Sequence, residues 1–148
     1  RSAEQPAVRA ELLTPGTVLG TLRFTYRAEH APAYLVDVRD DSPVYDGGAI
    51  CHPGFLARQA NYVLSRSVRL GPWIHVGTTA WHRGLVRDGD EVDVRGVVRD
   101  EYERAGHRFV ELDVEIAAGG TPVWSAAHTA IWLPRAAATD AGSSPAGR

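Results

Sequence analysis

The chain of 148 residues carries a net charge of −2 at pH 7, and 44% of its residues are hydrophobic, which is typical of one globular domain with a substantial core. The balanced charge excludes a strongly basic nucleic-acid-binding surface, and no apolar run is long enough to span a bilayer. No signal-peptide pattern opens the chain, and the single cysteine, Cys51, cannot form an internal disulfide. We therefore expect a cytoplasmic protein with no membrane and no nucleic-acid partner.

In the N-terminal third of the chain, segments with clear hydrophobic periodicity alternate with segments that have little. Residues 1–13 show little periodicity and are expected to form a surface arm. After a turn signal at 14–16, apolar and polar residues alternate over 18–26, which indicates a half-buried strand. Residues 28–38 indicate a short helix or an extended turn. Residues 39–48 are dense in Asp, Ser, Pro and Gly and indicate a loop.

The stretch 49–70 is predicted to be one long helix around which the rest of the chain is organised. Pro53 suits a first helical turn, where its missing N–H costs nothing. Apolar or small residues then recur at helical spacing, and Gly71-Pro72 ends the pattern. The recurring residues are Leu56, Ala60, Val63 and Ser67.

Beyond this helix the hydrophobic period changes to two, which indicates consecutive antiparallel strands. The expected strands are 73–86 (a strand pair or one bent strand), 91–99, 109–116 and 122–133, with turns at 87–90, 102–106 and 118–120. Residues 136–148 are small and polar, and we expect them to be a disordered tail. The order predicts an α+β fold, with a curved antiparallel β-sheet wrapped around one long central helix, in a single domain spanning 14–135.

Four segments carry a family likeness: 39–45 (RDDSPVY), 50–54 (ICHPG), 86–92 and 130–134. The first resembles the signature Gly-Asp-x-Asn-Pro-aliphatic-His, and the second resembles an Ile-Ala-His-Gly helix start. Together they resemble the MaoC-like branch of the hot-dog fold superfamily, the R-specific enoyl-CoA hydratases and dehydratases. This resemblance implies a hot-dog fold and a lyase that acts on acyl thioesters of coenzyme A or acyl carrier protein.

The resemblance also implies catalytic residues. Asp40 falls on the family's catalytic Asp, and Tyr45 falls on its catalytic His. Because the unperturbed pKa of tyrosine is about 10, Tyr45 is a poor base at neutral pH but can donate a proton. His52, at the helix start, is the other candidate partner for Asp40. Pro53 has no N–H, so Gly54 or a neighbour is expected to hold the thioester oxygen at the helix N-terminus.

Further residues are expected to bind substrate, and each candidate also has a purely structural interpretation. The expected binding residues are Cys51, Pro53, Gly54, Trp73 and His75. Asp40 can be an ordinary turn residue. Tyr45 can be an aromatic residue of the core, and His52 can simply cap the helix. Of His75 and His82, at most one should face the pocket. Cys51 is discounted as a thiolate paired with His52, because adjacent side chains rarely point at each other.

No His pair has metal-ligand spacing and no phosphate-binding or nucleophile-elbow motif occurs, so we expect no metal and no cofactor. Three functions remain open. The first is a hydratase or dehydratase with an altered catalytic pair, acting on an acyl thioester or a related small molecule. The second is a hot-dog thioesterase, and the third is a non-catalytic binding or assembly subunit. The family likeness further implies a homodimer or a higher even oligomer.

Overall fold

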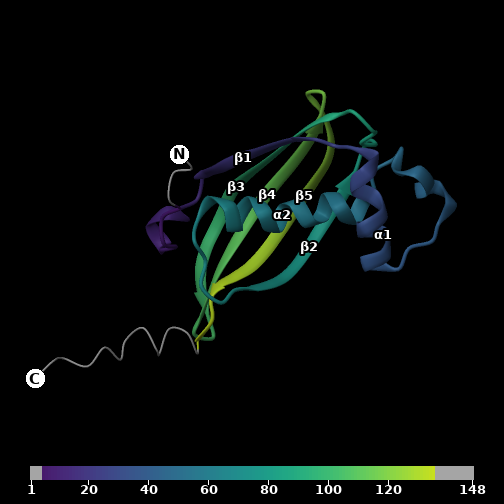
Figure 1. Cartoon of the computed structure of the whole chain (residues 1–148). Coiled ribbons are helices and arrows are strands. Elements are labelled where there is room, and N and C mark those ends of the chain that lie inside the picture. The colour runs from purple at the N-terminus through teal and green to yellow at the C-terminus, as the bar shows by residue number, and fades with distance from the viewer. Residues whose placement is uncertain (1–4, 136–148) are drawn as a thin grey trace, which may run out of the picture.

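A five-stranded sheet curves around one helix in the computed structural model, which describes residues 5–135 (Figure 1). The strands are β1 (Val18–Thr25), β2 (Ile74–His82), β3 (Glu91–Arg104), β4 (His107–Ala118) and β5 (Thr121–Leu133). The α-helices are α1 (Ala31–Val38) and α2 (Pro53–Ser67), and short 3₁₀ turns are η1 (Ala10–Leu12), η2 (Ala28–His30) and η3 (Pro43–Gly48). The predicted α+β fold, a curved antiparallel sheet around one long central helix, is confirmed.

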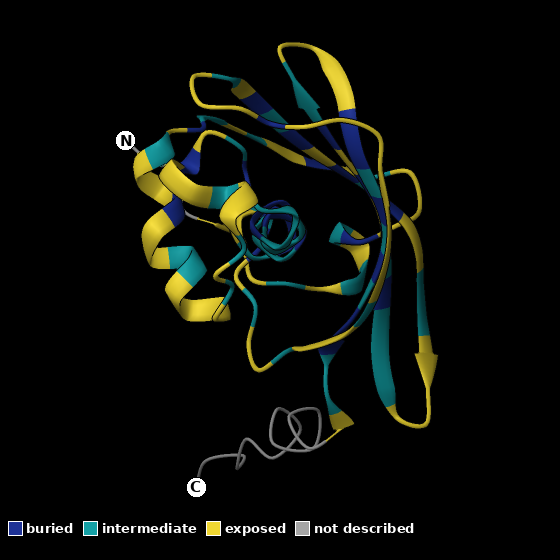
Figure 2. Cartoon of the chain, turned by 90° about the vertical axis from the view of Figure 1, so that its right-hand side faces the viewer, coloured by how far each residue is buried: buried dark blue, intermediate teal, exposed yellow. Residues whose placement is uncertain are grey.

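The sheet has the strand order β1-β3-β4-β5-β2, and every neighbouring pair is antiparallel. The chain therefore leaves one edge after β1, passes through α1 and α2, and returns at the opposite edge as β2. Seen along α2, the strands bend around the helix (Figure 2). The helix α1 lies at the end where α2 begins (Figure 1). This crossover brings the loop after α1 to the N-terminus of α2.

The core lies between α2 and the concave face of the sheet. The buried residues of α2 are Phe55, Leu56, Gln59, Ala60, Val63 and Leu64. Opposite them, β3 buries every second residue from Val92 to Val98, which is the alternation expected of a half-buried strand. Helix and sheet approach closely at Gly96, where an added Cβ would lie 2.5 Å from a methyl carbon of Val63. A glycine is required there because any side chain would push α2 away.

Several element boundaries differ from the sequence prediction. The helix predicted at 49–70 begins at Pro53 and ends at Ser67, because Val68 already has extended backbone angles. Residues 73–86 contain one strand. The turn predicted at 102–106 begins too early, since Tyr102 still pairs with Phe109 across the hairpin and their rings stack at 5.2 Å.

The N-terminal segment predicted to be an arm contributes to the core at its last residue. Leu13 is fully buried, and the Val8 N–H donates to the Arg69 carbonyl. The tail predicted at 136–148 lies outside the described residues. No helix within residues 5–135 combines the length and the apolar character needed to cross a membrane.

Candidate functional site

Asp40 is fixed by the end of α1. Arg39 takes up the left-handed conformation, with φ of 55°, and the Asp40 N–H donates back to the carbonyl of Leu35. The side-chain oxygen Oδ1 of Asp40 then accepts the N–H of Ser42 at 2.9 Å. Aspartate in such a turn commonly bonds the backbone two residues on. The carboxylate is therefore held in one orientation by its own loop.

His52 is the N-cap residue of α2, and both of its ring nitrogens are engaged. Its Nδ1 accepts the N–H of Gly54 at 2.9 Å, which satisfies one of the free amides at the helix start. Because Nδ1 accepts, the ring proton resides on Nε2. That nitrogen donates to Oδ2 of Asp40 at 3.0 Å. The imidazole thus joins the loop after α1 to the first turn of α2.

Asp40 is ionised at neutral pH. The hydrogen bond from the Ser42 amide, and after it the bond from His52, hold the pKa of the Asp40 carboxyl below its ordinary value. Partial desolvation opposes this shift. The Asp40 side chain keeps 30% of its surface exposed and the His52 side chain 18%, so the carboxylate can still accept a hydrogen bond from water.

Two tyrosines flank His52. The Tyr45 ring lies 4.7 Å from the His52 ring, and the Tyr34 ring lies 5.3 Å from it. Within residues 5–135 neither phenol hydroxyl has a hydrogen-bond partner. Burial raises the pKa of Tyr34. The Tyr34 hydroxyl oxygen lies so close to the Cα of Gly54 that a Cβ there would overlap it.

A cavity of about 310 Å³ adjoins this group, between η3, the start of α2 and the end of β2. Its walls are mainly apolar and include Val44, Tyr45, Cys51, Pro53, Leu56 and His82. Asp40 and His52 do not line it. Tyr45 belongs both to the cavity wall and to the contact with His52, so it is the side chain through which the Asp40–His52 pair reaches the cavity.

The structure brings Asp40, Tyr45 and His52 together and places Cys51 and Pro53 in the cavity wall. The sequence predicts an oxyanion donor at Gly54 or a neighbour, and in the structure the Gly54 N–H is bonded to His52 Nδ1. Burial raises the pKa of Cys51 to about 12, so its thiol stays protonated at neutral pH.

Trp73 and His75 are not brought to this group. His75 bonds Thr78 and stacks on His128 near the other end of β2. At about 3.3 Å per strand residue, His75 lies about 23 Å from His82, which is the histidine that lines the cavity. Tyr34 is a neighbour of His52 that the sequence did not predict. The pattern that could have indicated this is that Tyr34 follows Ala31, the buried residue of α1, by three residues and so lies on the same helix face.

No three metal-ligating side chains of the described residues, counting His, Cys, Asp and Glu, lie close enough together to hold a metal ion. The polar side chains of this group are one carboxylate, one oriented imidazole and two phenols. Such a set can orient water, accept a proton at the carboxylate and donate one from a phenol.

No family model matches the sequence, and no curated protein shows significant sequence similarity to it. Solved structures do resemble it. An (R)-hydratase from A. caviae involved in PHA biosynthesis is 20% identical, with a TM-score of 0.69 over 82% of this chain and 98% of that one. A MaoC-like dehydratase from Rhodospirillum rubrum is 19% identical, with a TM-score of 0.68 over 86% and 99%. The HadBC (3R-hydroxyacyl-ACP dehydratase) complex from Mycobacterium tuberculosis is 20% identical, with a TM-score of 0.66 over 79% and 96%.

Proposed function

We propose, from the hot-dog fold that this chain shares with MaoC-like dehydratases and (R)-hydratases, that it is a lyase that hydrates or dehydrates an acyl thioester. The acyl group would be carried by coenzyme A or by an acyl carrier protein. One observation carries this proposal: Asp40 is hydrogen-bonded to His52, and the His52 ring contacts the ring of Tyr45, which lines a cavity.

In the proposed hydration, the ionised Asp40 orients a water molecule and takes its proton as the water oxygen adds to the β-carbon. Negative charge then develops on the thioester oxygen, and the Tyr45 hydroxyl donates a hydrogen bond to that oxygen. As the enolate collapses, the proton held by Asp40 passes to the α-carbon, which completes the addition of water and restores the carboxylate. His52 acts as a positioning residue, because its two ring nitrogens are already used by Asp40 and Gly54. Dehydration follows the same steps in reverse.

We further propose that a second copy of this chain covers the cavity. Among the strands of residues 5–135, β2 pairs only with β5, so its outer edge carries backbone groups that no described strand pairs. Four large apolar side chains on and just after this strand are about half exposed: Ile74, Val76, Trp81 and Leu85. Edge-to-edge pairing of two β2 strands would bury them and close the mouth of the cavity. Light scattering coupled to size-exclusion chromatography tests this, and a monomer at micromolar concentration contradicts it.

A non-catalytic binding subunit is the second candidate function. It is favoured by two observations: the Gly54 amide is occupied by His52, and neither Asp40 nor His52 lines the cavity. Such a subunit would bind an acyl thioester without converting it.

The experiment that separates these functions is turnover with a panel of trans-enoyl-CoA and saturated acyl-CoA thioesters. Loss of enoyl absorbance supports the lyase. Release of free thiol instead assigns a thioesterase. If acyl-CoA binds in a calorimetric titration but neither enoyl loss nor thiol release is observed, the protein is assigned as a binding subunit.

A further inference from the structure

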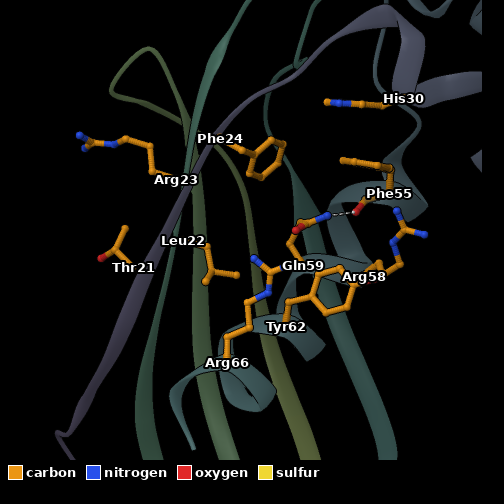
Figure 3. A pocket seen from close by; sticks show the side chains of 10 residues that line it. All are labelled: Thr21, Leu22, Arg23, Phe24, His30, Phe55, Arg58, Gln59, Tyr62 and Arg66. Atoms are coloured by element: carbon orange, nitrogen blue, oxygen red, sulfur yellow. Dashed lines mark hydrogen bonds between the residues drawn. The ribbon is translucent and has the colours of Figure 1, made fainter. Parts of the chain in front are cut away.

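A second and larger cavity, of about 520 Å³, lies between the edge strand β1 and the opposite flank of α2 (Figure 3). One part of its wall is apolar, with Leu22, Phe24 and Phe55. Another part is cationic, with Arg58 and Arg66. The proposed lyase reaction uses none of these residues.

The cationic wall is one stripe of α2. Arg58, Tyr62 and Arg66 follow one another at a spacing of four residues, which places them on one helix face. The Arg66 guanidinium lies over the Tyr62 ring at 5.3 Å. The Arg58 guanidinium lies 4.9 Å from the Phe55 ring centre and 5.0 Å from that of Tyr34. Stacking on aromatic faces fixes the two guanidinium groups without neutralising their charge.

Neither guanidinium has an acidic partner within residues 5–135. No Asp or Glu lines the cavity, and α2 contains none. The Nε atom of Arg58 is buried and has no hydrogen-bond partner in the described part of the chain.

Arg23 shows the contrast. It lines the same cavity, but its Nε bonds Oδ1 of Asp93 at 2.6 Å. In Figure 3 the Arg23 side chain points away from the cavity, whereas Arg66 points into it toward Gln59. The cavity thus presents unneutralised positive charge from α2 alone.

The apolar wall specifies the rest of the ligand. The His30 and Phe55 rings are nearly parallel, with an interplanar angle of 6° and centres 6.3 Å apart. Phe24 meets Phe55 edge-on at 6.2 Å. Flat aromatic surfaces of this kind favour an aromatic or other planar apolar group.

We propose that this cavity binds a small molecule that carries a carboxylate or a phosphate on a planar apolar body. The oxyanion pairs with Arg66, and the apolar body lies against Phe24 and Phe55. Tyr34 contacts both Arg58 and His52, so it separates this site from the proposed catalytic group. The proposal is independent of the lyase function.

Calorimetric titration of the full chain with phenyl phosphate, phenylacetate and the neutral benzyl alcohol tests the proposal. We expect one anion equivalent to bind per chain, and benzyl alcohol to bind at least tenfold more weakly. Tighter binding of phenyl phosphate identifies a phosphate site, and tighter binding of phenylacetate a carboxylate site. Equal binding of the neutral probe, or no binding of either anion, would overturn the proposal.

Matched variants locate the site. We expect Arg66→Gln to weaken anion binding at least tenfold and Arg66→Lys to restore part of it. Arg95→Gln, on the exposed side of β3, should leave binding unchanged. Asp40→Asn should also leave it unchanged, which separates a failure of this site from a failure of the proposed lyase. Unchanged binding in Arg66→Gln, with a normal circular dichroism spectrum, would refute the assignment.

Discussion

Asp40 and His52, which lie 12 residues apart in sequence, are joined by a 3.0 Å hydrogen bond between the loop after α1 and the N-cap of α2. The other ring nitrogen of His52 accepts the Gly54 amide, so the imidazole has one defined tautomer. The pair therefore links the stability of the helix start to the ionisation of a partly exposed carboxylate. In this pair Asp40 carries the charge, and His52 fixes the orientation of the Asp40 carboxylate.

Asp40→Asn should alter stability only where Asp40 is ionised. The folded-state pKa of Asp40 is lowered, chiefly by the Ser42 amide, so the folded state favours the carboxylate. Its contribution is therefore fully present above the unfolded pKa of about 3.9 and is lost as pH falls through the lower folded pKa. Urea unfolding of the wild type and the variant from pH 2.5 to 7 measures this.

The matched control is Asp41→Asn, because Asp41 makes no hydrogen bond to a described residue. It should follow the wild-type stability curve at every pH. A stability difference between wild type and Asp40→Asn that stays constant down to pH 2.5 is incompatible with an ionised Asp40 in the folded state.

Tyr45→Phe should keep the ring contact with His52 and remove the hydroxyl. If Tyr45 donates to the thioester oxygen, we expect kcat to fall about 100-fold with little change in KM, as is typical of a lost proton or hydrogen-bond donor. Steady-state kinetics on an enoyl-CoA substrate measure it. Tyr102→Phe is the control, since its hydroxyl bonds Glu111 in the hairpin of β3 and β4. An equal fall in kcat in both variants would contradict the proposed role of Tyr45.

Gly54→Ala should destabilise the fold by about 1–3 kcal/mol, because the new Cβ overlaps the Tyr34 hydroxyl and lies 3.0 Å from His52 Nδ1. Tyr34→Phe removes that hydroxyl oxygen. The double variant should therefore be more stable than the sum of the two single effects predicts. A double-mutant cycle from urea unfolding measures the coupling, and strict additivity would show that the overlap with Tyr34 is relieved at no cost.

His128 should make the fold sensitive to mild acid. Burial, and then the neighbouring His75, lower the pKa of His128 to about 4. Between that value and the unfolded pKa of about 6.5, the unfolded state binds the extra proton, so stability falls as pH falls through this window. Over the whole window the loss should be about 3 kcal/mol. His128→Gln should lose this pH dependence, whereas His107→Gln should retain it. Parallel curves for wild type and His128→Gln would contradict the assignment.

The sequence predicted the architecture well because the hydrophobic period changes sharply at Gly71-Pro72, from helical to alternating. It also predicted that Asp40, Tyr45 and His52, which lie close in sequence on either side of one loop, come together in space, and the structure places them in contact. What it could not predict was how His52 caps its own helix, since that depends on the ring orientation and uses the amide of Gly54. Nor could alternation along β2 indicate which end of the strand lies near α2, so His75 was chosen where His82 lines the cavity.

We propose that Asp40 acts on water at an acyl thioester. The most direct measurement is the initial rate of hydration of a trans-enoyl-CoA panel by the wild type, Asp40→Asn and Asp41→Asn, followed by enoyl absorbance. We predict turnover by the wild type and Asp41→Asn, and a rate at least about 100-fold lower for Asp40→Asn. A wild-type rate in Asp40→Asn, or no turnover of any enoyl-CoA by the wild type, would contradict the claim.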